Sequence, residues 1–452
     1  MANFTIDEAV NKWGQVLDGT DLGPIKESHR KRVTAVMMEN SQRELGSLVG
    51  YGQHQGLNES AIPVNFMGAS SSTAGAGGID TFDPIMISLL RRTMPNLMAY
   101  DIMGVQPMTG PTGLIFALRS RYTNQSGGEN FYNEVNGQFT TVVSGANTIG
   151  LKQVGTLPGN STQTVNLAST GLYNFATGMS TAQSEALGTD SNTAFAEMSF
   201  TIEKVTATAV ARGLRAQYTL ELAQDLKAVH GLDVETELSN ILTTEIMAEI
   251  NREMVRSIYV TAKQGCSVGT TTAGIFDCDT DSNGRWSAEK WKGLMYQIER
   301  ESNKIAKDTR RGRGNIIICS SDVASALEMA GKLTNTPYLN TNGFSPDDTG
   351  STFIGILNGR YKVYIDPYVT GDFFVVGYKG QNPYDAGLFY CPYVPLFQVR
   401  AQDPVSYVPS IGFKTRYAVV ANPFAEGLTK GGGTLDKDSN LYYRRVLVQN
   451  LL

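Results

Sequence analysis

The chain has 452 residues, 38 basic and 43 acidic side chains, and a formal net charge of −5 at pH 7. This length predicts two or three domains and is ample for a buried core. Charged residues make up only 18% of the chain, below the ~25% that is usual for soluble domains. So few charges suit a protein that buries much of its outside against copies of itself, and the negative balance gives no electrostatic case for nucleic-acid binding.

Cysteine spacing and hydropathy exclude several protein classes. No CxxC pair occurs among the four cysteines, which are Cys266, Cys278, Cys319 and Cys391. We therefore expect free thiols in a reducing compartment and no structural zinc. No apolar run approaches the ~18 residues that span a bilayer, and Asp7 and Glu8 lie where a signal peptide would be cationic and apolar. Synthesis in the cytoplasm, without membrane contact, is the expectation.

Residues 1–59 are predicted to form a separate helical unit. A first helix is expected from Ile6 to Leu17, because apolar residues recur there at helical spacing. Pro24 suits the start of a second helix, whose apolar stripe lies among charges and would need a partner. A polar stretch over 50–59 follows, and after Met67 the small-residue segment GASSSTAGAGG indicates an extended linker.

A long polar insert between two strands is predicted next. The pattern indicates a helix at 84–90, a strand at 115–120 and a second strand at 199–211. The insert between the strands spans about 123–197 and is rich in Gly, Asn, Ser and Thr. Its short strand-like pieces are 140–143 and 164–167. Two strands that flank such an excursion predict a protruding hairpin with an embellished tip.

The strongest helix signal lies between Asp233 and Thr261. Asp233 can cap this helix, and about 40 Å of length would let it serve as the spine of an elongated subunit. From Ser287 onward, helices and strands alternate and predict a compact α/β or α+β lobe. The expected helices are 287–309 and 322–329, and the expected strands are 315–319, 361–365, 373–378, 387–390, 411–422 and 441–448.

No constellation of residues in the sequence supports catalysis. The three histidines are His29, His54 and His230, and a helix boundary explains His230 better than a general base does. No GxSxG motif occurs. The segment Gly331-Lys332-Leu333-Thr334 lacks the glycine spacing of a phosphate-binding loop.

Two charged motifs have simple structural explanations. Asp277, Asp279 and Asp281 resemble the start of a calcium loop, but Ala288 stands where that loop needs a glutamate, so a solvated acidic turn is favoured. The basic run Arg310-Arg311-Gly312-Arg313 could contact phosphate, although pairing with acidic residues or solvation is favoured. We expect no enzymatic activity, no cofactor and no metal.

Several long blocks resemble the major capsid protein of T4-like tailed bacteriophages, and they cover most of the chain from Arg91 onward. The first two blocks are RRTMPNLMAYDIMGVQPMTGPTGLIFALR and ELAQDLKAVHGLDVETELSNILTTEIMAEINRE. The later blocks are GRYKVYIDPY, GYKGQNPYDAGLFYCPYV, GFKTRYAVVANPFAE and YYRRV. Gapless blocks of this length, in the family's order, are far more specific than any short motif.

The resemblance implies an α+β subunit with an HK97-like fold. The implied parts are a scaffold-facing N-terminal propeptide at 1–59, an N-arm and the start of the peripheral domain at 60–113, an extended loop with its insertion at 114–211, a peripheral domain with a spine helix at 212–272, an axial domain at 273–403, and C-terminal strands at 404–452 that return to the peripheral domain. The insertion is shorter than the family's best-known member would suggest. Whether it folds independently is left open.

The resemblance also implies maturation by a prohead protease, which cuts after Glu when Leu or Ile stands two residues before it. Leu57-Asn58-Glu59, followed by Ser60, matches that pattern in a polar stretch that proteases can reach. An ordinary linker is the alternative. Arg119 and Arg121, on the expected loop strand, are candidates for inter-subunit ion pairs, with a solvated strand face as the alternative.

The implied function is structural: copies of the chain assemble into hexamers and form the virion head shell around packaged DNA. The implied partners are other copies, the scaffolding core, the prohead protease, vertex, portal and decoration proteins, DNA bound non-specifically, and a host or phage chaperonin. A capsid vertex protein or an encapsulin-like shell protein of the same fold is the alternative. A cytoplasmic hydrolase that uses Asp366 and Asp385 is a remote one, since structural turns explain both residues.

Overall fold

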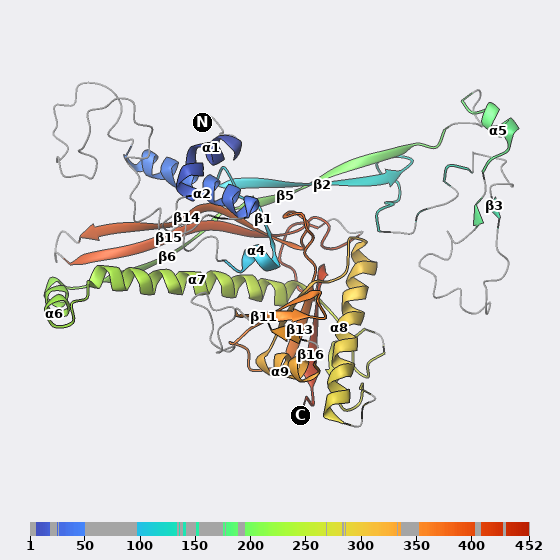
Figure 1. The fold of residues 1–452 in the computed structure, drawn as a ribbon. Helices are drawn as coiled ribbons and strands as arrows, with labels where there is room; N and C mark the ends of the chain where they lie inside the picture. Colours follow the sequence, from blue (N-terminus) through green and yellow to red (C-terminus); the bar gives the residue numbers. More distant parts are fainter. Residues whose placement is uncertain are drawn as a thin grey trace, which may run out of the picture.

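The computed structural model describes residues 6–18, 25, 27–49, 97–132, 135, 139–141, 151–152, 175–176, 178–188, 195–267, 269–282, 284, 286–331, 333–335, 352–402, 408–427 and 431–451. Helices and strands both contribute, which confirms the expected α+β class. Figure 1 shows a body crossed by one long helix, a lobe below it that carries the C-terminus, and a two-stranded ribbon that reaches out to one side.

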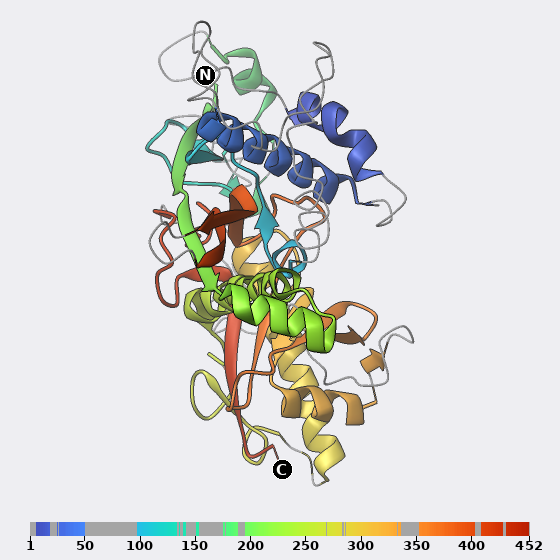
Figure 2. The same cartoon turned by 90° about the vertical axis from the view of Figure 1, so that its left-hand side faces the viewer.

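The body is built on a four-stranded sheet with the order β1-β14-β15-β6. Its strands are β1 (Gly104–Val105), β14 (Leu388–Gln402), β15 (Pro409–Ala421) and β6 (Val210–Gln217). The inner strand β15 pairs antiparallel with both β14 and β6, whereas the edge strand β1 is parallel to β14. On one side of this sheet lies α7 (Val234–Thr261), and on the other lie α1 (Ile6–Leu17) and α2 (Ser28–Val49), as Figures 1 and 2 show.

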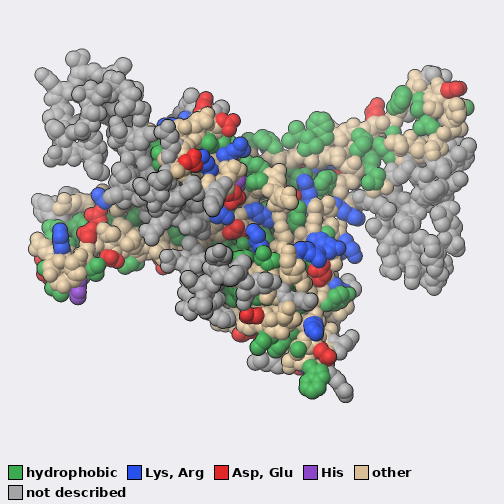
Figure 3. Space-filling view, viewed as in Figure 1, with side chains coloured by type: hydrophobic (Ala, Val, Ile, Leu, Met, Phe, Trp, Pro, Cys, Tyr) green, Lys and Arg blue, Asp and Glu red, His purple; other side chains and the backbone are tan. Residues whose placement is uncertain are grey.

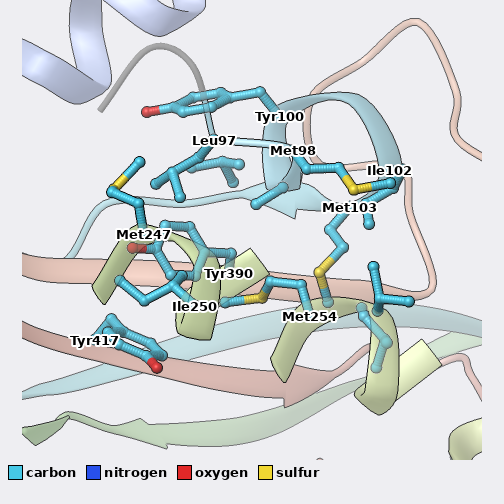
Figure 4. Close-up of a cluster of buried hydrophobic side chains, with 14 of the residues drawn as sticks. Leu97, Met98, Tyr100, Ile102, Met103, Met247, Ile250, Met254, Tyr390 and Tyr417 are labelled. Carbon is cyan, nitrogen blue, oxygen red and sulfur yellow. The ribbon is translucent and has the colours of Figure 1, made fainter. Parts of the chain in front are cut away.

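The helix α7 is the spine of the body. It contains 28 residues, which at 1.5 Å per residue makes it about 42 Å long. Side chains on one face are buried at every fourth position from Leu242 to Ile258. Figure 4 shows Met247, Ile250 and Met254 from this face packed against residues in and beside the short helix α4 (Ala99–Ile102), with Tyr390 of β14 and Tyr417 of β15 nearby. This core joins segments that are far apart in the chain.

The lower lobe contains an eight-stranded sheet with the order β10-β11-β12-β9-β13-β16-β7, and β8 pairs with β16. Its strands are β7 (Ala262–Gln264), β8 (Ile275–Asp277), β9 (Ile316–Cys319), β10 (Leu333–Asn335), β11 (Thr352–Leu357), β12 (Tyr361–Ile365), β13 (Phe373–Gly377) and β16 (Asn440–Gln449). Strands β9 and β13 are entirely buried, which explains why they are uninterrupted apolar runs rather than alternating patterns. The helices α8 (Ser287–Thr309) and α9 (Ser321–Met329) contribute to the core of this lobe.

The ribbon consists of β2 (Thr112–Tyr122) and β5 (Met198–Thr208), which pair antiparallel along their whole length. Parts of the insert lie at its far end (Figure 1). These described parts are the strands β3 (Leu151–Lys152) and β4 (Phe175–Ala176), which pair with each other, and the helix α5 (Thr181–Glu185).

Most of the expected elements are confirmed. The helices expected at 6–17, 233–261, 287–309 and 322–329 match α1, α7, α8 and α9 to within one residue at each end. The helix expected at 84–90 and the strand-like piece at 164–167 lie outside the described residues. Thr140 and Thr141 form a turn rather than a strand.

Sheet membership differs from the expected division of the chain at residue 403. β14 was expected in the axial domain, but it lies in the four-stranded sheet of the body. β16 was expected to return to the peripheral domain, but it lies inside the eight-stranded sheet of the lobe. The residue pattern of a strand predicts which of its faces are buried, whereas the identity of its partner depends on distant parts of the chain.

Candidate assembly surfaces

The inner face of the ribbon seats it on the body. Side chains alternate between the two faces of a strand, and Ile115 of β2 and Val205 of β5 point inward and are buried. They form one apolar cluster with Phe389 of β14 and Val420 of β15. Gly433 approaches the same place at a positive φ of 82°, and a Cβ there would come within 2.1 Å of the Val205 side chain. The root of the ribbon is therefore closely packed.

The outer face of the ribbon is apolar and uncovered. We define it by six side chains that are between 45% and 65% exposed: Leu114, Phe116, Leu118, Met198, Phe200 and Ile202. Leu118 lies directly opposite Ile202, and the others occupy alternate positions along the two strands. Figure 3 shows hydrophobic side chains along this part of the ribbon. Contiguous apolar surface of this kind is uncommon on a monomer and marks an interaction site.

A buried ion cluster fixes the ribbon to its surroundings. Arg119 of β2 has a fully buried side chain, and its guanidinium pairs with Glu129 and with Glu203, each at 2.8 Å. It also donates hydrogen bonds to the carbonyl oxygens of Gly427, at 2.7 Å, and Pro423, at 3.0 Å. The cluster therefore ties both ribbon strands, the start of the insert and the turn after β15 into one unit.

The two arginines proposed for inter-subunit ion pairs have partners within their own chain. All of the Arg119 contacts above are of this kind. Arg121 donates from Nε to the Thr201 hydroxyl at 3.1 Å and from Nη1 to the Gly127 carbonyl at 3.0 Å. A contact with a neighbouring subunit stays a prediction for both residues, while the structure assigns Arg119 a role inside the subunit. Sequence reasoning missed Glu129 and Glu203, although Glu203 lies on the same ribbon face and could be found once the strand register was known.

The N-terminal hairpin, which we define as residues 6–49 with helices α1 and α2, packs on the chain's own body. Trp13, Leu17, Val33 and Met37 are completely buried and belong to the same cluster as the core of α7. This differs from the expectation that the apolar stripe of the second helix would need an outside partner. The body itself covers that stripe, because strands and helices distant in the chain meet beneath it.

Polar contacts also join the hairpin to the body. The buried Asn40 side chain donates from Nδ2 to the carbonyl oxygens of Met108 and Tyr393, at 2.7 and 2.8 Å. His29 lies with Nε2 at 3.0 Å from the Val105 carbonyl at the sheet edge, and the Arg30 guanidinium lies 3.1 Å from the Asp101 carboxylate.

Burial lowers the pKa of two basic side chains at the hairpin site, His29 and Lys379. Burial lowers the pKa of His29 below its usual value, although the Val105 carbonyl opposes the shift. Burial also lowers the pKa of Lys379, to about 8, against the opposing charge of Asp101. The Lys379 ammonium donates a hydrogen bond to the Tyr100 carbonyl, so this cation is satisfied beneath the hairpin.

The helix α6 (Leu220–His230), which the sequence pattern did not predict, lies at the end of the body opposite the ribbon (Figure 1). Thr219 caps it by accepting a hydrogen bond from the Leu222 amide. None of its residues is buried, and Leu220, Leu222 and Val229 are exposed. His230 is the last residue of α6 and is exposed, which confirms its helix-boundary role.

The carboxylates of the hydrolase alternative serve structural roles. Asp366 accepts hydrogen bonds from the Tyr259 hydroxyl, at 2.8 Å, and the Tyr368 amide, at 3.1 Å, and it pairs with Arg252. The cavity beside Asp366 measures only about 10 Å³, which is room for about one water molecule. Asp385 accepts a hydrogen bond from the Tyr378 hydroxyl at 3.1 Å. Both carboxylates therefore have partners within the chain.

The acidic turn at 277–281 is held by its own hydrogen bonds. Asp281 accepts from the amide of Thr271 at 2.8 Å and from that of Asp277 at 3.0 Å. Burial alone would raise the pKa of Asp281, but these backbone hydrogen bonds outweigh it and lower the pKa. Within the described parts of the chain, no group of three or more His, Cys, Asp or Glu residues could hold a metal ion.

The cysteines are buried and are not paired in disulfides, as expected. Burial raises the pKa of Cys266, Cys319 and Cys391 to about 12 and that of Cys278 to about 11. A thiol with so high a pKa carries almost no thiolate near neutral pH and is a poor nucleophile.

Two further sequence predictions concern processing and membranes. Leu57, Asn58, Glu59 and Ser60 lie outside the described residues. Of the helices that the structure does describe, none combines the length and apolarity needed to cross a bilayer.

Comparisons with known proteins agree on one family. The family model described as major capsid protein Gp23 matches residues 79–448. The major capsid protein of Serratia phage KSP90 is 38% identical over 449 residues, which cover 95% of this chain and 96% of that protein. The major capsid protein of Enterobacteria phage T4 is 35% identical and covers 98% of this chain and 99% of its own. The capsid vertex protein of Escherichia phage AR1 is 28% identical over 55% of this chain and 60% of its own.

Solved phage capsids overlap with the structure only loosely. The capsid of Myoviridae phage XM1 covers 76% of this chain and 89% of its own at 8% identity, with a TM-score of 0.38. That of Mycobacterium phage Bobi covers 90% of this chain and 98% of its own at 9% identity, with a TM-score of 0.39. The assignment therefore depends on the sequence relatives, whose identity extends over nearly the whole chain. The chain belongs to the Gp23 family of major capsid proteins.

Proposed function

We propose that this chain is the subunit from which a phage head shell is built, by assembly into hexamers that enclose packaged DNA. Membership of the major capsid protein family supports the structural role. The observation that carries self-assembly is the uncovered outer face of the ribbon. Burial of such a face against a neighbouring copy would stabilise the contact between the two copies. Repeated head-to-tail contacts close into a ring, and many modest contacts add up in a closed lattice.

The fold supports separate roles for the ribbon, the body and the lobe in the assembled shell. Residues 114–211 form the extended loop that reaches a neighbour, with the ribbon as its stem and the insertion at 123–197, and α7 is the spine of the peripheral domain. The eight-stranded lobe is the axial domain, whose copies meet around the hexamer axis. Sheet pairing supports placing β14 with the peripheral domain and β16 with the axial domain.

Processing is the second part of the proposal. A prohead protease removes residues 1–59 by cutting between Glu59 and Ser60. Before that cut, the charged outer side of the hairpin, which includes exposed Glu8 and Lys12, contacts the scaffolding core. Later partners are vertex, portal and decoration proteins, with DNA contacted non-specifically and a chaperonin assisting folding. The shell subunit has no enzymatic activity and needs no cofactor.

Assembly of a variant ribbon tests the central proposal. Replacing two outer-face residues, Phe116→Ser with Phe200→Ser, should leave the isolated subunit folded but abolish particles in electron micrographs. The matched control, Phe116→Leu with Phe200→Leu, keeps the face apolar and should assemble. Normal assembly of the serine variant, at wild-type yield, would show that the outer face is not a contact between subunits.

Intact mass of the chain from purified particles tests processing. A species that begins at Ser60 is expected. Full-length chain in DNA-filled particles would contradict processing while leaving the shell role intact. The vertex role is not favoured, because identity to the vertex protein is lower and extends over only about half of the chain.

A further inference from the structure

The hairpin is built into the main core of the subunit and is not an appendage. Its buried side chains share one cluster with α4, α7 and β14. Along α2, the run from Val33 to Met38 is buried at every position, because α1 packs on one side of the helix and the body packs on another. Packing of the apolar face of an amphipathic helix on an apolar surface is a recurrent mode of non-covalent recognition.

At the hairpin site, polar side chains of the hairpin pair with individual backbone carbonyls of the body, as polar groups do in a folded interior. Asn40 uses both hydrogens of its amide, on the carbonyls of Met108 and Tyr393. These two carbonyls lie where pairing between the segment after β1 and β14 ends, at Pro392, which has no N–H to donate. His29 serves the Val105 carbonyl in the same way, at the outer edge of the sheet. Loss of the hairpin would exchange these donors for water at the Val105, Met108 and Tyr393 carbonyls.

We propose that the surface formed by α4, β1 and β14 is a docking site that retains residues 6–49 non-covalently after the chain is cut between residues 49 and 97. This inference rests on the proposed processing of the N-terminal segment. Cutting removes only the tether, which acts through effective concentration, and leaves every contact of the site in place. Cleavage and release are therefore two separate steps. Release requires a change in the shape of the surface, such as a displacement of β14 relative to α4.

A cut that does not depend on the phage protease tests this directly. The recognition sequence of a specific protease is inserted between residues 50 and 51 of the full-length chain, and the purified, unassembled subunit is cut and passed over a size-exclusion column. The two pieces should elute together, with both masses present in one peak at about 1 µM. Separate elution of the small piece under these native conditions would overturn the proposal.

Variants of the same cut chain identify the contacts that hold the hairpin. Asn40→Leu removes both donors at similar size and should increase release by about tenfold or more. Asp18→Asn is the matched control, because Asp18 pairs with Lys31 inside the hairpin, and it should behave as wild type. Equal retention by Asn40→Leu and Asp18→Asn would overturn the assignment of this site. His29→Ala replaces Asn40→Leu if circular dichroism shows that the uncut leucine variant is unfolded.

The outcomes separate docking from processing. If the pieces elute together while virions contain full-length chain, the docking site stands and the proposed cut after Glu59 is wrong. If virions lack residues 1–59 but the artificially cut subunit loses its hairpin at once, processing stands and the docking site is wrong.

Discussion

The ribbon and the N-terminal hairpin both carry a row of apolar side chains, but the chain covers only one of these rows. Phe116 and Ile202 on the outer face of the ribbon are 65% and 63% exposed, whereas Trp13 and Met37 of the hairpin are 0% exposed. An element with a bare apolar face is incomplete in a single subunit and indicates a partner. An element whose apolar face is already buried stabilises its own subunit, so the hairpin is part of this fold until something removes it.

The two regions are also anchored by different chemistry. The ribbon is fixed by a buried cation between two carboxylates, Arg119 with Glu129 and Glu203. The hairpin is fixed chiefly by the neutral Asn40 amide on two backbone carbonyls, and its ion pair with the body, Arg30 with Asp101, is partly exposed. Removal of one member of a buried ion cluster leaves an uncompensated charge, whereas removal of a neutral donor leaves only unsatisfied acceptors. Mutations at the two sites should therefore lower the free energy of unfolding by different amounts.

The largest effect is expected at the ion cluster. Arg119→Met should lower the free energy of unfolding of the unassembled subunit by about 3–5 kcal/mol, because Glu129 and Glu203 would stay buried without their cation. Urea denaturation measures this loss. Adding Glu129→Gln and Glu203→Gln to the methionine variant should recover part of it. Arg121→Ala, at a half-buried position with neutral partners, is the control and should cost about 1 kcal/mol.

Removal of the Asn40 side chain should lower the free energy of unfolding by less than removal of the Arg119 cation does. Asn40→Leu in the uncut chain should lower the free energy of unfolding by about 2–4 kcal/mol, because two buried carbonyls lose their donor. The same urea titration measures it, with Asp18→Asn expected to cost at most about 1 kcal/mol. A loss from Asn40→Leu as small as that of the control would remove the distinction between a built-in hairpin and an appendage.

Substitutions on the two faces of the ribbon should lower the stability of the subunit by different amounts. Leu118→Asn on the outer face should change the stability of the subunit by about 0.5 kcal/mol or less, because that side chain is already exposed. Val205→Asn on the inner face should cost several times more, because it buries an amide in an apolar cluster. Thermal unfolding of the two variants side by side compares them. Equal losses would mean that the outer face is covered within the subunit.

The smallest effect concerns pH at the hairpin site. Burial holds the pKa of His29 below its usual 6.5, so below that pH the unfolded chain binds a proton that the folded chain resists. The stability contributed at His29 is therefore present at neutral pH and falls as the pH drops through 6.5. Thermal unfolding at about pH 7.5 and about pH 5.5 should show a larger loss for wild type than for His29→Gln. A smaller loss for wild type would contradict this sign.

Local pattern in the sequence determined most of the secondary structure. The 3.6-residue period gave α1, α7, α8 and α9 nearly to the residue, because periodic burial is recorded along a continuous segment. The long blocks shared with capsid proteins indicated the family. The same reasoning placed Arg119 on a ribbon strand, but it could not find Glu129, whose position depends on how the insert folds back.

The tertiary structure alone decided which surfaces are covered. The strands β14 and β16 lie in different sheets, because strand pairing joins residues far apart in the chain. The stripe of α2 and the outer face of the ribbon are both apolar in the sequence, and nothing local distinguishes them. One is buried by α4, α7 and β14 and the other is not. Coverage is a property of long-range packing, and on it depends which apolar surface is left for another subunit.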